Sequence, residues 1–356
     1  MRVLLAMSGG VDSSVAGVLL RRDGHDVVGV TLKLWGGESD SGCCSVSDVD
    51  DARRAAQQLG IDHLVFNFAD DFRRQVVDPY VADHAAGVTP NPCVECNRHV
   101  KFDRLYRRAE QLGFDAVATG HHARVGRLAD GTYTLERGAD AAKDQSYVVH
   151  MLAQADLART LFPVGSIDKA EVRRIAADVG VRTATKPDSQ DVCFITSTGG
   201  RETFLGDRIP LRRARVVDTD GVTVGALDAV ELVTVGQRRG IGLPGGGPKR
   251  YVVDVDVPGA TVVVGSQDDL LDARLGVTAL AWTADPLPDG TPVRVQCSAH
   301  GASSVARWHD APGAEGGTLV WETPQRRMAP GQSVVLYDLA DTRVLGGGTA
   351  LRAVAG

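Results

Sequence analysis

Two short stretches of this sequence bring together residue types that could do chemistry. The first, AMSGGVDSS at residues 6–14, holds two adjacent glycines, one aspartate and three serines. The second, TPNPCVECNRHVKF at residues 89–102, places Cys93 and Cys96 at CxxC spacing in front of several basic side chains. Adjacent glycines let backbone amides approach an anion, and a CxxC pair can be half of a zinc site, a redox pair or a nucleophile with its neighbour. The sequence therefore indicates an anion site and a thiol site.

The first stretch lies between an expected strand, RVLLAM at residues 2–7, and an expected helix, SSVAGVLLRRDG at residues 13–24. Doubly wound sheets bind phosphates at this kind of junction, because backbone amides and the positive end of the helix face the anion. The loop lacks the Gly-Lys-Ser/Thr of a kinase-type loop. A carboxylate beside phosphates needs a cation between them, so Asp12 predicts Mg²⁺ on a bound polyphosphate.

The elements that must position these groups alternate between strand and helix over the first half of the chain. Further strands are expected at residues 26–35, 63–69 and 114–120, and further helices at residues 47–60, 101–113 and 168–180. Repeated strand–helix units form parallel sheets with helices on both faces. We therefore expect an α/β doubly wound parallel sheet, of the type that binds ATP, in an N-terminal domain at residues 1–203.

After about residue 200 the chain consists of short strands separated by turn signals. ARVVDTDGVTVGAL at residues 214–227 and KRYVVDVDVPGATVVVG at residues 249–265 are typical of hairpins with Asp-Gly and Pro-Gly turns. The spacing of the later strands is typical of a small barrel or sandwich. We expect a small, mostly β central domain at residues 204–270 and a C-terminal β-barrel at residues 271–356.

Composition limits the class of protein and the role of the cysteines. The 356 residues are 43% hydrophobic and 24% charged, which is ordinary for a globular protein of two or three domains. No apolar run approaches the roughly 20 residues of a membrane span, and the N-terminal run is too short for a signal peptide. We expect a cytoplasmic protein without membrane contact, whose six cysteines are thiols, metal ligands or catalysts.

The charge pattern allows contact with nucleic acid only at local patches. The net charge is −6, so the chain as a whole does not attract a polyanion. Basic residues cluster at four places: Arg98, Lys101, Arg104, Arg107 and Arg108; Arg212, Arg213 and Arg215; Arg238, Arg239, Lys249 and Arg250; and Arg326 with Arg327. Each cluster is either a solvated face or part of an RNA contact.

Several motifs together resemble a known family. SGGVDS is the pattern of the PP-loop, or N-type, ATP pyrophosphatases, which cleave ATP between the α and β phosphates. Further matching motifs are TPNPCVECNRHVKF, GHHAR at residues 120–124, KDQSY at residues 143–147, DSQDVCFI at residues 188–195, VGQRRGIGL at residues 235–243 and PQRRMAPGQSVVLY at residues 324–337. In this order, along essentially the whole chain, they resemble the tRNA-specific 2-thiouridylases.

The resemblance implies a reaction and a pair of catalytic cysteines. ATP would adenylate the C2 oxygen of the wobble uridine, and sulfur from a cysteine persulfide would then replace that oxygen, giving 2-thiouridine, AMP and pyrophosphate. Cys96 matches the family's nucleophile and Cys193 its persulfide carrier, with a disulfide between them as the by-product. Arg98 and Lys101 could stabilise the Cys96 thiolate and hold RNA phosphates.

The resemblance also implies binding residues and partners, with no metal held directly by protein side chains. The ATP-binding positions would be Ala6, Met7, Ser8, Gly9, Gly10, Val11, Asp12, Ser13, Leu32 and Gly120. The tRNA-binding positions would be Asn91, Pro92, Cys93, His121, Lys143, Asp144, Gln145 and Gln332, with Asn91 and Pro92 beside the flipped base. The partners would be tRNAs that read Lys, Glu and Gln codons, and a cysteine desulfurase or a sulfur-relay protein as the sulfur donor.

The residues leave alternatives open at the thiol site. Structural zinc needs four ligands, and no second CxxC occurs. Cys93, Cys96 and Cys193 could instead hold an iron–sulfur cluster, as in related sulfurtransferases. Two other readings are a PP-loop enzyme that acts on RNA without cysteine, and an RNA-binding module that no longer turns over ATP.

Two positions depart from the family's pattern, and one further cysteine pair has no expected role. Some family members have Asp at the position of Cys93, so no proton transfer is assigned there. The stretch RVQCSAH, with Gln296 and Cys297, stands where the family often has an Arg/Tyr-rich RNA contact, which leaves the barrel's tRNA contacts open. Cys43 and Cys44 lie in a stretch of small residues and are expected to be incidental.

Overall fold

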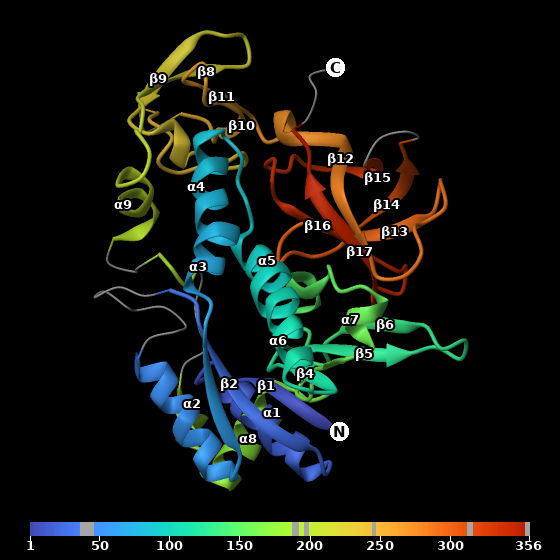
Figure 1. Cartoon of the computed structure of the whole chain (residues 1–356). Helices are drawn as coiled ribbons and strands as arrows, with labels where there is room; N and C mark the ends of the chain where they lie inside the picture. Colours follow the sequence, from blue (N-terminus) through green and yellow to red (C-terminus); the bar gives the residue numbers. More distant parts are fainter. Residues whose placement is uncertain (36–45, 187–191, 196–198, 244–246, 312–315, 353–356) are drawn as a thin grey trace.

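Three β-sheets organise the computed structural model (Figure 1), which describes residues 1–35, 46–186, 192–195, 199–243, 247–311 and 316–352. The parallel sheet lies at one end of the molecule, a small sheet lies at the other, and a barrel lies beside the helices that join them. Cys43, Cys44 and residues 188–191 of the DSQDVCFI motif lie outside the described residues. Within the described ranges, no helix has the length and apolar character of a membrane span.

The N-terminal sheet is parallel, with strand order β3-β2-β1-β4-β7. Its strands are β1 (Arg2–Ala6), β2 (Asp26–Lys33), β3 (Asp62–Asn67), β4 (Ala116–Ala118) and β7 (Thr160–Leu161). On one face, Val3 and Leu5 of β1 pack in an apolar cluster with the helices α1 (Val11–Arg22), α2 (Val46–Leu59) and α8 (Lys169–Val179). On the other face, Leu4 packs in a second cluster that includes α6 (Leu105–Gln111). The expected doubly wound sheet is confirmed.

One continuous helical stretch carries both cysteines of the CxxC pair. It consists of α5 (Pro92–Glu95), the π-helical segment η2 (Cys96–Arg104) and α6. The expected helix began only at residue 101. The observed helix begins earlier because the Asn91 side chain caps it, accepting a hydrogen bond from the Val94 amide at 3.3 Å, and because proline suits the first helical position.

The remaining helices of the first 206 residues are short. They are α3 (Ala69–Phe72), η1 (Arg73–Val77), α4 (Asp78–Ala85), η3 (Ser146–Val149), α7 (Gln154–Leu157), η4 (Arg182–Thr185) and α9 (Gly200–Gly206). Two further short turns, η5 (Val230–Leu232) and η6 (Asp268–Leu270), flank the central sheet. The helices α3 and α4, with η1 between them, form the rod that runs from the parallel sheet towards the small sheet (Figure 1).

The central sheet consists of two hairpins joined in parallel, with strand order β10-β11-β8-β9. Its strands are β8 (Ala214–Asp218), β9 (Thr223–Leu227), β10 (Tyr251–Asp256) and β11 (Thr261–Gly265). Gly221 adopts φ +82° in the first turn, a left-handed conformation that glycine reaches without strain. Both hairpins expected from the turn residues are present, and their valines form the core of this sheet.

The C-terminal strands close into a six-stranded antiparallel barrel. They are β12 (Leu271–Trp282), β13 (Pro292–Gln296), β14 (Ser304–Asp310), β15 (Gly316–Arg326), β16 (Ser333–Tyr337) and β17 (Arg343–Ala350). The long strand β12 pairs with β15 at one edge and with β17 at the other, which closes the barrel. The expected barrel is confirmed.

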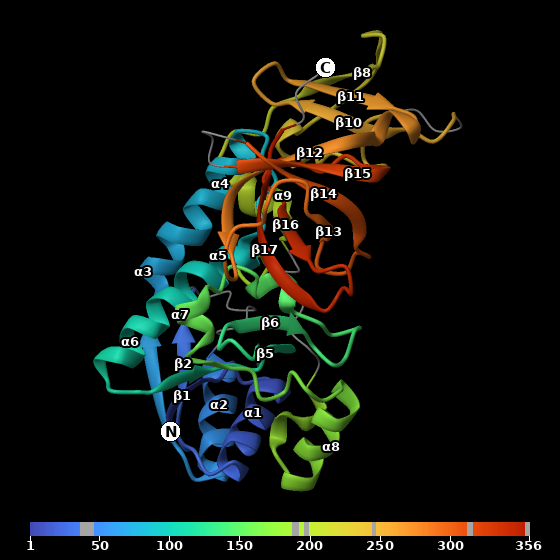
Figure 2. The same ribbon diagram turned by 90° about the vertical axis from the view of Figure 1, so that its right-hand side faces the viewer.

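A hairpin of the N-terminal region that the sequence did not predict joins this barrel sheet. β5 (Ala123–Arg127) pairs with β6 (Tyr133–Arg137), and β6 continues onto β17. Figure 2 shows this hairpin between the parallel sheet and the barrel. Arg137 fixes the junction, because its guanidinium lies 2.7 Å from Asp144 and 2.7 Å from Asp341 and stacks 3.7 Å from the Tyr337 ring centre. The β5–β6 hairpin, which follows the parallel-sheet strand β4 in the chain, therefore joins the α/β region to the barrel.

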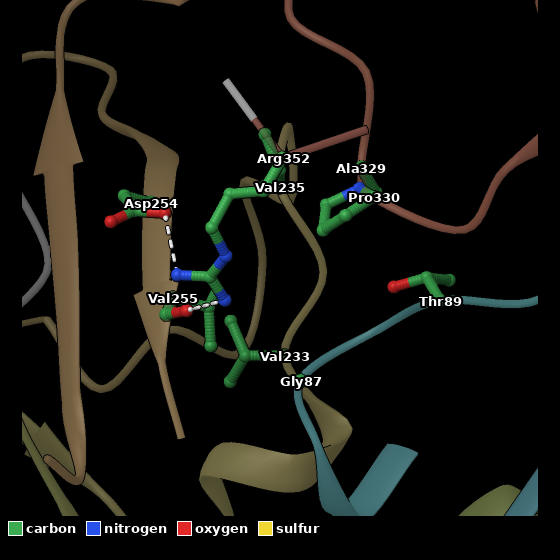
Figure 3. A pocket seen from close by; sticks show the side chains of 9 residues that line it. All are labelled: Gly87, Thr89, Val233, Val235, Asp254, Val255, Ala329, Pro330 and Arg352. Carbon is green, nitrogen blue, oxygen red and sulfur yellow. Dashed lines mark hydrogen bonds and ion pairs between the residues drawn. The ribbon is translucent and has the colours of Figure 1, made fainter. Parts of the chain in front are cut away.

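The central sheet, the barrel and the loop before α5 meet at one small cavity of about 10 Å³ (Figure 3). Arg352, after the last barrel strand, donates to the Val255 carbonyl at 2.9 Å and lies 3.7 Å from the Asp254 carboxylate. The Thr89 amide donates to the Pro330 carbonyl at 2.8 Å. The loop that leads to Asn91 is thus supported from the barrel side.

Candidate active site

The glycine loop after β1 is shaped by its own hydrogen bonds. Gly9 has φ +71°, and a Cβ atom there would lie 2.4 Å from the Asp48 carbonyl oxygen. The Ser13 hydroxyl donates to the Gly10 carbonyl at 3.1 Å and accepts from the Ser8 amide at 3.3 Å. Gly10 is the N-cap of the helix α1, which has 12 residues. The loop therefore places a tight turn at the positive end of a helix, as an anion site requires.

The carboxylate in this loop has two basic partners. The Lys169 ammonium lies 2.7 Å from both oxygens of Asp12, and His122 Nε2 lies 3.0 Å from one of them. Burial alone would raise the pKa of Asp12, but the hydrogen bonds from His122 and Lys169 outweigh burial and lower the pKa. Asp12 is therefore an anion held beside a largely buried lysine.

A second lysine closes the loop from the other side. The Lys186 ammonium donates to the Gly9 carbonyl at 3.1 Å, to Asp48 at 2.6 Å and to Asp51 at 2.8 Å. Burial would lower the pKa of Lys186, and these two carboxylates raise it. The loop itself contains no lysine, so tertiary structure supplies the cations that flank it.

Sequence reasoning missed Lys169, Lys186 and His122. His122 belongs to the GHHAR motif, in which the resemblance implies a role for His121 alone. Lys169 begins the expected helix at residues 168–180, where a lysine at the positive helix end is unfavourable and could have been noticed. For Lys186, the only sequence signal is its position shortly before the DSQDVCFI motif.

The positions predicted to bind ATP gather at one edge of the sheet. Ala6 ends β1, Leu32 is buried near the end of β2, and Gly120 follows β4. A Cβ atom at Gly120 would lie 2.6 Å from the Ser13 amide nitrogen, so the backbone after β4 packs directly on the glycine loop. The edge formed by the carboxyl ends of parallel strands is where such sheets bind ligands.

Cys96 and Cys193 contribute to the same apolar cluster. Cys96 is buried on η2, and Cys193 is half-buried and packs against that cluster. The neighbouring Phe194 anchors the Cys193 segment, since its ring centre lies 5.3 Å from that of Tyr80 and 5.2 Å from that of Phe204. These two residues, far apart in sequence, therefore belong to one large apolar cluster of the α/β region.

Cys93 differs from Cys96 in its surroundings. It is exposed on α5, one helical turn before the buried Cys96. In the parts of the chain that the structure describes, no group of three or more His, Cys, Asp or Glu side chains could hold a metal ion. The three cysteines are therefore not assembled as cluster ligands in this conformation.

The loop that carries Asn91 and Pro92 is held by the barrel. Gln332, the residue before β16, donates from Nε2 to the Thr89 carbonyl at 2.7 Å. Pro92 is buried, and the Asn91 side chain is used to cap α5. Gln332 therefore holds the loop that carries these two residues.

The KDQSY stretch contains residues with different surroundings. Lys143 is exposed. Asp144 is buried against Arg137 at 2.7 Å, and it also accepts hydrogen bonds from Ser146 and from the Gly138 amide. Gln145 accepts from the His122 amide at 2.9 Å. Lys143 is thus exposed at the surface, whereas the Asp144 and Gln145 side chains bond to neighbouring segments of the chain.

His121 packs between two aromatic rings. Its ring centre lies 5.9 Å from that of Phe102 on η2 and 5.9 Å from that of Phe162, and its Nδ1 lies 2.7 Å from the Thr119 hydroxyl. Burial, with help from the nearby Lys101 charge, lowers the pKa of His121 to about 3. His121 is therefore neutral near pH 7 and links the backbone after β4 to the Cys96 helix.

Gln296 and Cys297, which are adjacent in sequence, have different surroundings. Gln296 accepts from Arg137 at 2.9 Å and donates to the Ser298 carbonyl at 2.8 Å. Cys297 packs against the apolar core of the barrel, and burial raises the pKa of its thiol to about 12. Gln296 therefore stabilises the junction between the barrel and the β5–β6 hairpin, through Arg137.

The fold and the loop define a class: an N-type, PP-loop nucleotide-binding domain followed by two β modules. Three family models match the chain in that order. They are described as tRNA methyl transferase HUP domain (residues 1–197), tRNA methyl transferase PRC-barrel domain (residues 202–266) and aminomethyltransferase beta-barrel domain (residues 273–350).

Curated relatives identify the family more closely. A protein of Chloroflexus aggregans is 46% identical over 98% of this chain and 98% of the relative. A protein of Mycobacteroides abscessus is 46% identical over 99% of this chain and 100% of the relative. A protein of Rhodococcus erythropolis is 47% identical over 98% of this chain and 97% of the relative. All three are named tRNA-specific 2-thiouridylase MnmA, and the chain belongs to this family.

Proposed function

We propose that this chain is an ATP-dependent tRNA 2-thiouridylase. It adenylates the C2 oxygen of the wobble uridine and then replaces that oxygen with sulfur from a cysteine persulfide. One short segment carries this proposal. Gln145 bonds to the backbone of His122, the partner of Asp12, and Val148 accepts a hydrogen bond at 2.8 Å from Asn97, the neighbour of Cys96. The phosphate loop and the thiol helix are thereby held by the same four residues.

The chemistry divides into two balanced steps. In the first, the uridine C2 oxygen attacks the α phosphorus of ATP, and pyrophosphate leaves. In the second, the terminal sulfur of a Cys193 persulfide attacks C2, and AMP leaves with the oxygen. The Cys96 thiolate then attacks Sγ of Cys193, which releases the thiouridine and forms a Cys96–Cys193 disulfide. A thiol reductant must restore both cysteines before the next turnover.

The loop residues fit ATP with Mg²⁺. The amides of the turn and the α1 N-terminus suit the phosphates, and Lys169 and Lys186 neutralise further charge. Mg²⁺ carried by the substrate phosphates would offset the charge of the Asp12 carboxylate without a direct bond to a protein side chain. Mg²⁺ would make pyrophosphate a better leaving group. We infer that the residues at the predicted ATP positions bind ATP, and that Asn91 and Pro92 contact the flipped uridine.

Two alternatives receive less support. The family models carry methyl transferase names, but methyl transfer uses neither the two motif cysteines nor cleavage of ATP at the α phosphorus. An iron–sulfur enzyme would need Cys93 together with Cys96 and Cys193, and within the described residues no group of three or more such side chains could hold a metal ion. The persulfide scheme needs only the latter pair.

The proposed reaction implies partners and a compartment. We infer that the substrates are tRNAs that read Lys, Glu and Gln codons, and that a cysteine desulfurase, alone or through a relay protein, loads Cys193. We place the enzyme in the cytoplasm, where tRNA and reduced thiols occur. Residues 1–203, 204–270 and 271–356 are the proposed domains, with the barrel as a tRNA-contacting part.

A reconstituted reaction tests the proposal. The purified chain is incubated with ATP, Mg²⁺, an unmodified tRNA transcript, cysteine and a cysteine desulfurase. Nucleoside mass spectrometry should find 2-thiouridine at the wobble position, with one AMP and one pyrophosphate formed for each. Methylated uridine, or no thiouridine despite an active desulfurase, would contradict the proposal. A brown, oxygen-sensitive protein would support the cluster instead.

A further inference from the structure

A groove on the α/β domain lies outside every site assigned above. It is a cavity of about 390 Å³ between the strand β3 and the helix α6, with part of η2. Eight residues line it: Val65, Phe66, Asn67, Phe68, Arg104, Arg107, Arg108 and Gln111. Three of these are arginines, two are amides, two are phenylalanines, and none is a carboxylate. We call this the β3–α6 groove.

The arginines present positive charge to the groove while their carboxylate partners lie outside its lining. Arg104 pairs with Asp71 at 3.0 Å, and Arg107 pairs with Asp103 at 2.8 Å. Arg108 donates to the Gln111 side chain at 3.2 Å and lies 5.4 Å from the Phe66 ring centre. The ion pairs hold the guanidinium groups in position at the surface, where they remain half-exposed or more.

The position of the groove relates it to Cys96. Arg104, Arg107 and Arg108 follow Cys96 on the same continuous helical stretch. An α-helix rises about 1.5 Å per residue and the π-helical segment η2 rises less, so Arg108 lies at most about 18 Å along the helix from Cys96. A distance of this size corresponds to a few stacked nucleotides of one strand.

The chemistry of the lining fits a polynucleotide backbone. Guanidinium groups bind phosphates, aromatic rings stack with bases, and amide side chains bond to base or sugar edges. Because the chain has a net charge of −6, contact with a polyanion requires such a local concentration of positive charge. Five of the eight lining residues are arginines or amides, and this polar and basic character favours RNA over a protein partner.

We propose that the β3–α6 groove binds the sugar–phosphate backbone of the tRNA on the stem side of the anticodon loop, while the wobble uridine reaches Cys96. This proposal rests on the proposed function, because it takes tRNA as the substrate. The sequence pointed to a basic segment, but the wall supplied by Phe66 and Asn67 comes from a strand that is distant in sequence.

The double variant Arg107→Gln/Arg108→Gln tests the groove, because glutamine keeps the helix and removes two charges. The dissociation constant for unmodified tRNA transcript is measured by filter binding at several salt concentrations. We expect it to rise about tenfold or more near 0.15 M salt, and the log–log salt slope to become shallower by about 2. The KM for tRNA in thiolation should rise by a similar factor, because these residues are proposed to act in tRNA binding.

Arg174→Gln is the matched control. Arg174 is an exposed helical arginine on α8 that pairs with Glu171 and Asp178, as Arg107 pairs with Asp103. It should leave the tRNA dissociation constant and the salt slope unchanged. Equal effects of both variants, or no effect of the double variant, would overturn the proposal.

Two further results separate the proposals from each other. If the double variant binds tRNA normally but loses sulfur transfer only when a protein persulfide donor replaces a small-molecule alkyl persulfide, the groove binds a protein and the RNA proposal is wrong. If the wild-type chain makes no thiouridine and the double variant still loses tRNA affinity, the groove binds RNA and the proposed function fails alone.

Discussion

The Lys169 ammonium lies 2.7 Å from both carboxylate oxygens of Asp12, although 157 positions separate the two residues in sequence. Asp12 is on the first turn of α1, and Lys169 begins α8 on the same face of the sheet. The pair therefore places a cation at the mouth of a phosphate loop that has no lysine of its own. Its proposed task is to neutralise the phosphates when ATP binds.

Replacing Lys169 with methionine should impair the first half-reaction. The change removes the cation and leaves Asp12 to repel the phosphates, so tRNA-stimulated pyrophosphate release should fall about 100-fold, with a higher KM for ATP. The tRNA dissociation constant should not change. Arg21→Met, at an exposed arginine in the last turn of α1, is the control and should release pyrophosphate normally. Normal release by Lys169→Met would exclude the proposed role of this lysine.

Serine at Cys96 or at Cys193 should abolish thiouridine formation, because each thiol has its own task in the proposed second step. Adenylation needs neither thiol, so pyrophosphate release should survive in both variants. Cys93→Ser distinguishes the two schemes, since it should leave thiolation intact if the persulfide scheme holds. Loss of thiolation in all three variants, together with bound iron, would favour the cluster.

Alanine at Gly9 should disable the loop for a geometric reason. The residue has φ +71°, and the added Cβ would lie 2.4 Å from the Asp48 carbonyl oxygen. Gly24→Ala is a matched control, because Gly24 has φ +78° but no neighbour within 4 Å of an added Cβ. Both variants should lose about 1 kcal/mol of stability from the φ change. Only Gly9→Ala should lose pyrophosphate release, and equal activity of the two would contradict the loop geometry.

Adjacent residues of the KDQSY stretch should separate folding from binding. Asp144→Asn leaves the half-buried Arg137 without one of its charge partners, so the free energy of unfolding should fall by about 3 kcal/mol in urea denaturation. Lys143→Gln changes an exposed side chain and should keep normal stability while weakening tRNA binding several-fold. If Asp144→Asn unfolds like the wild type, the ion pair with Arg137 does not stabilise this junction.

His150 should make the protein less stable in mild acid. Burial lowers its pKa to about 4, and its Nε2 has no hydrogen-bond partner in the described residues. An unfolded histidine binds its proton near pH 6.5, so between pH 6.5 and 4 the unfolded state binds more protons. Stability should therefore fall with pH in that window, by up to about 1.4 kcal/mol per pH unit for this residue.

The variant His150→Gln checks this contribution. Urea unfolding is followed at several pH values, and the comparison uses the slope of unfolding free energy against pH rather than its absolute value. The slope between pH 6 and 4.5 should become shallower in the variant, although burial also lowers the pKa of His84 to about 4 and so preserves part of it. An unchanged slope would show that His150 is not held neutral by burial.

Local patterns were enough for most of the helices and strands, although not for the β5–β6 hairpin. The hairpin turn at Gly221 and the loop at Gly9 depend on backbone conformations that glycine adopts most easily, so they can be read from the residues themselves. The parallel sheet follows from alternating strands and helices, and the barrel from evenly spaced short strands. The start of the Cys96 helix was missed because one Asn91 hydrogen bond decides it.

By itself, the sequence determined most of the strands outside the β5–β6 hairpin and the place of the glycine loop between β1 and α1. Only the tertiary structure decided that Lys169 meets Asp12, that Asp144 is buried against Arg137, and that β6 extends the barrel sheet. The physical reason is that a backbone turn depends on neighbouring residues, whereas the partner of a charge or of a strand edge depends on packing between distant segments. The residues next to a lysine or an aspartate in the sequence do not identify its partner in the fold.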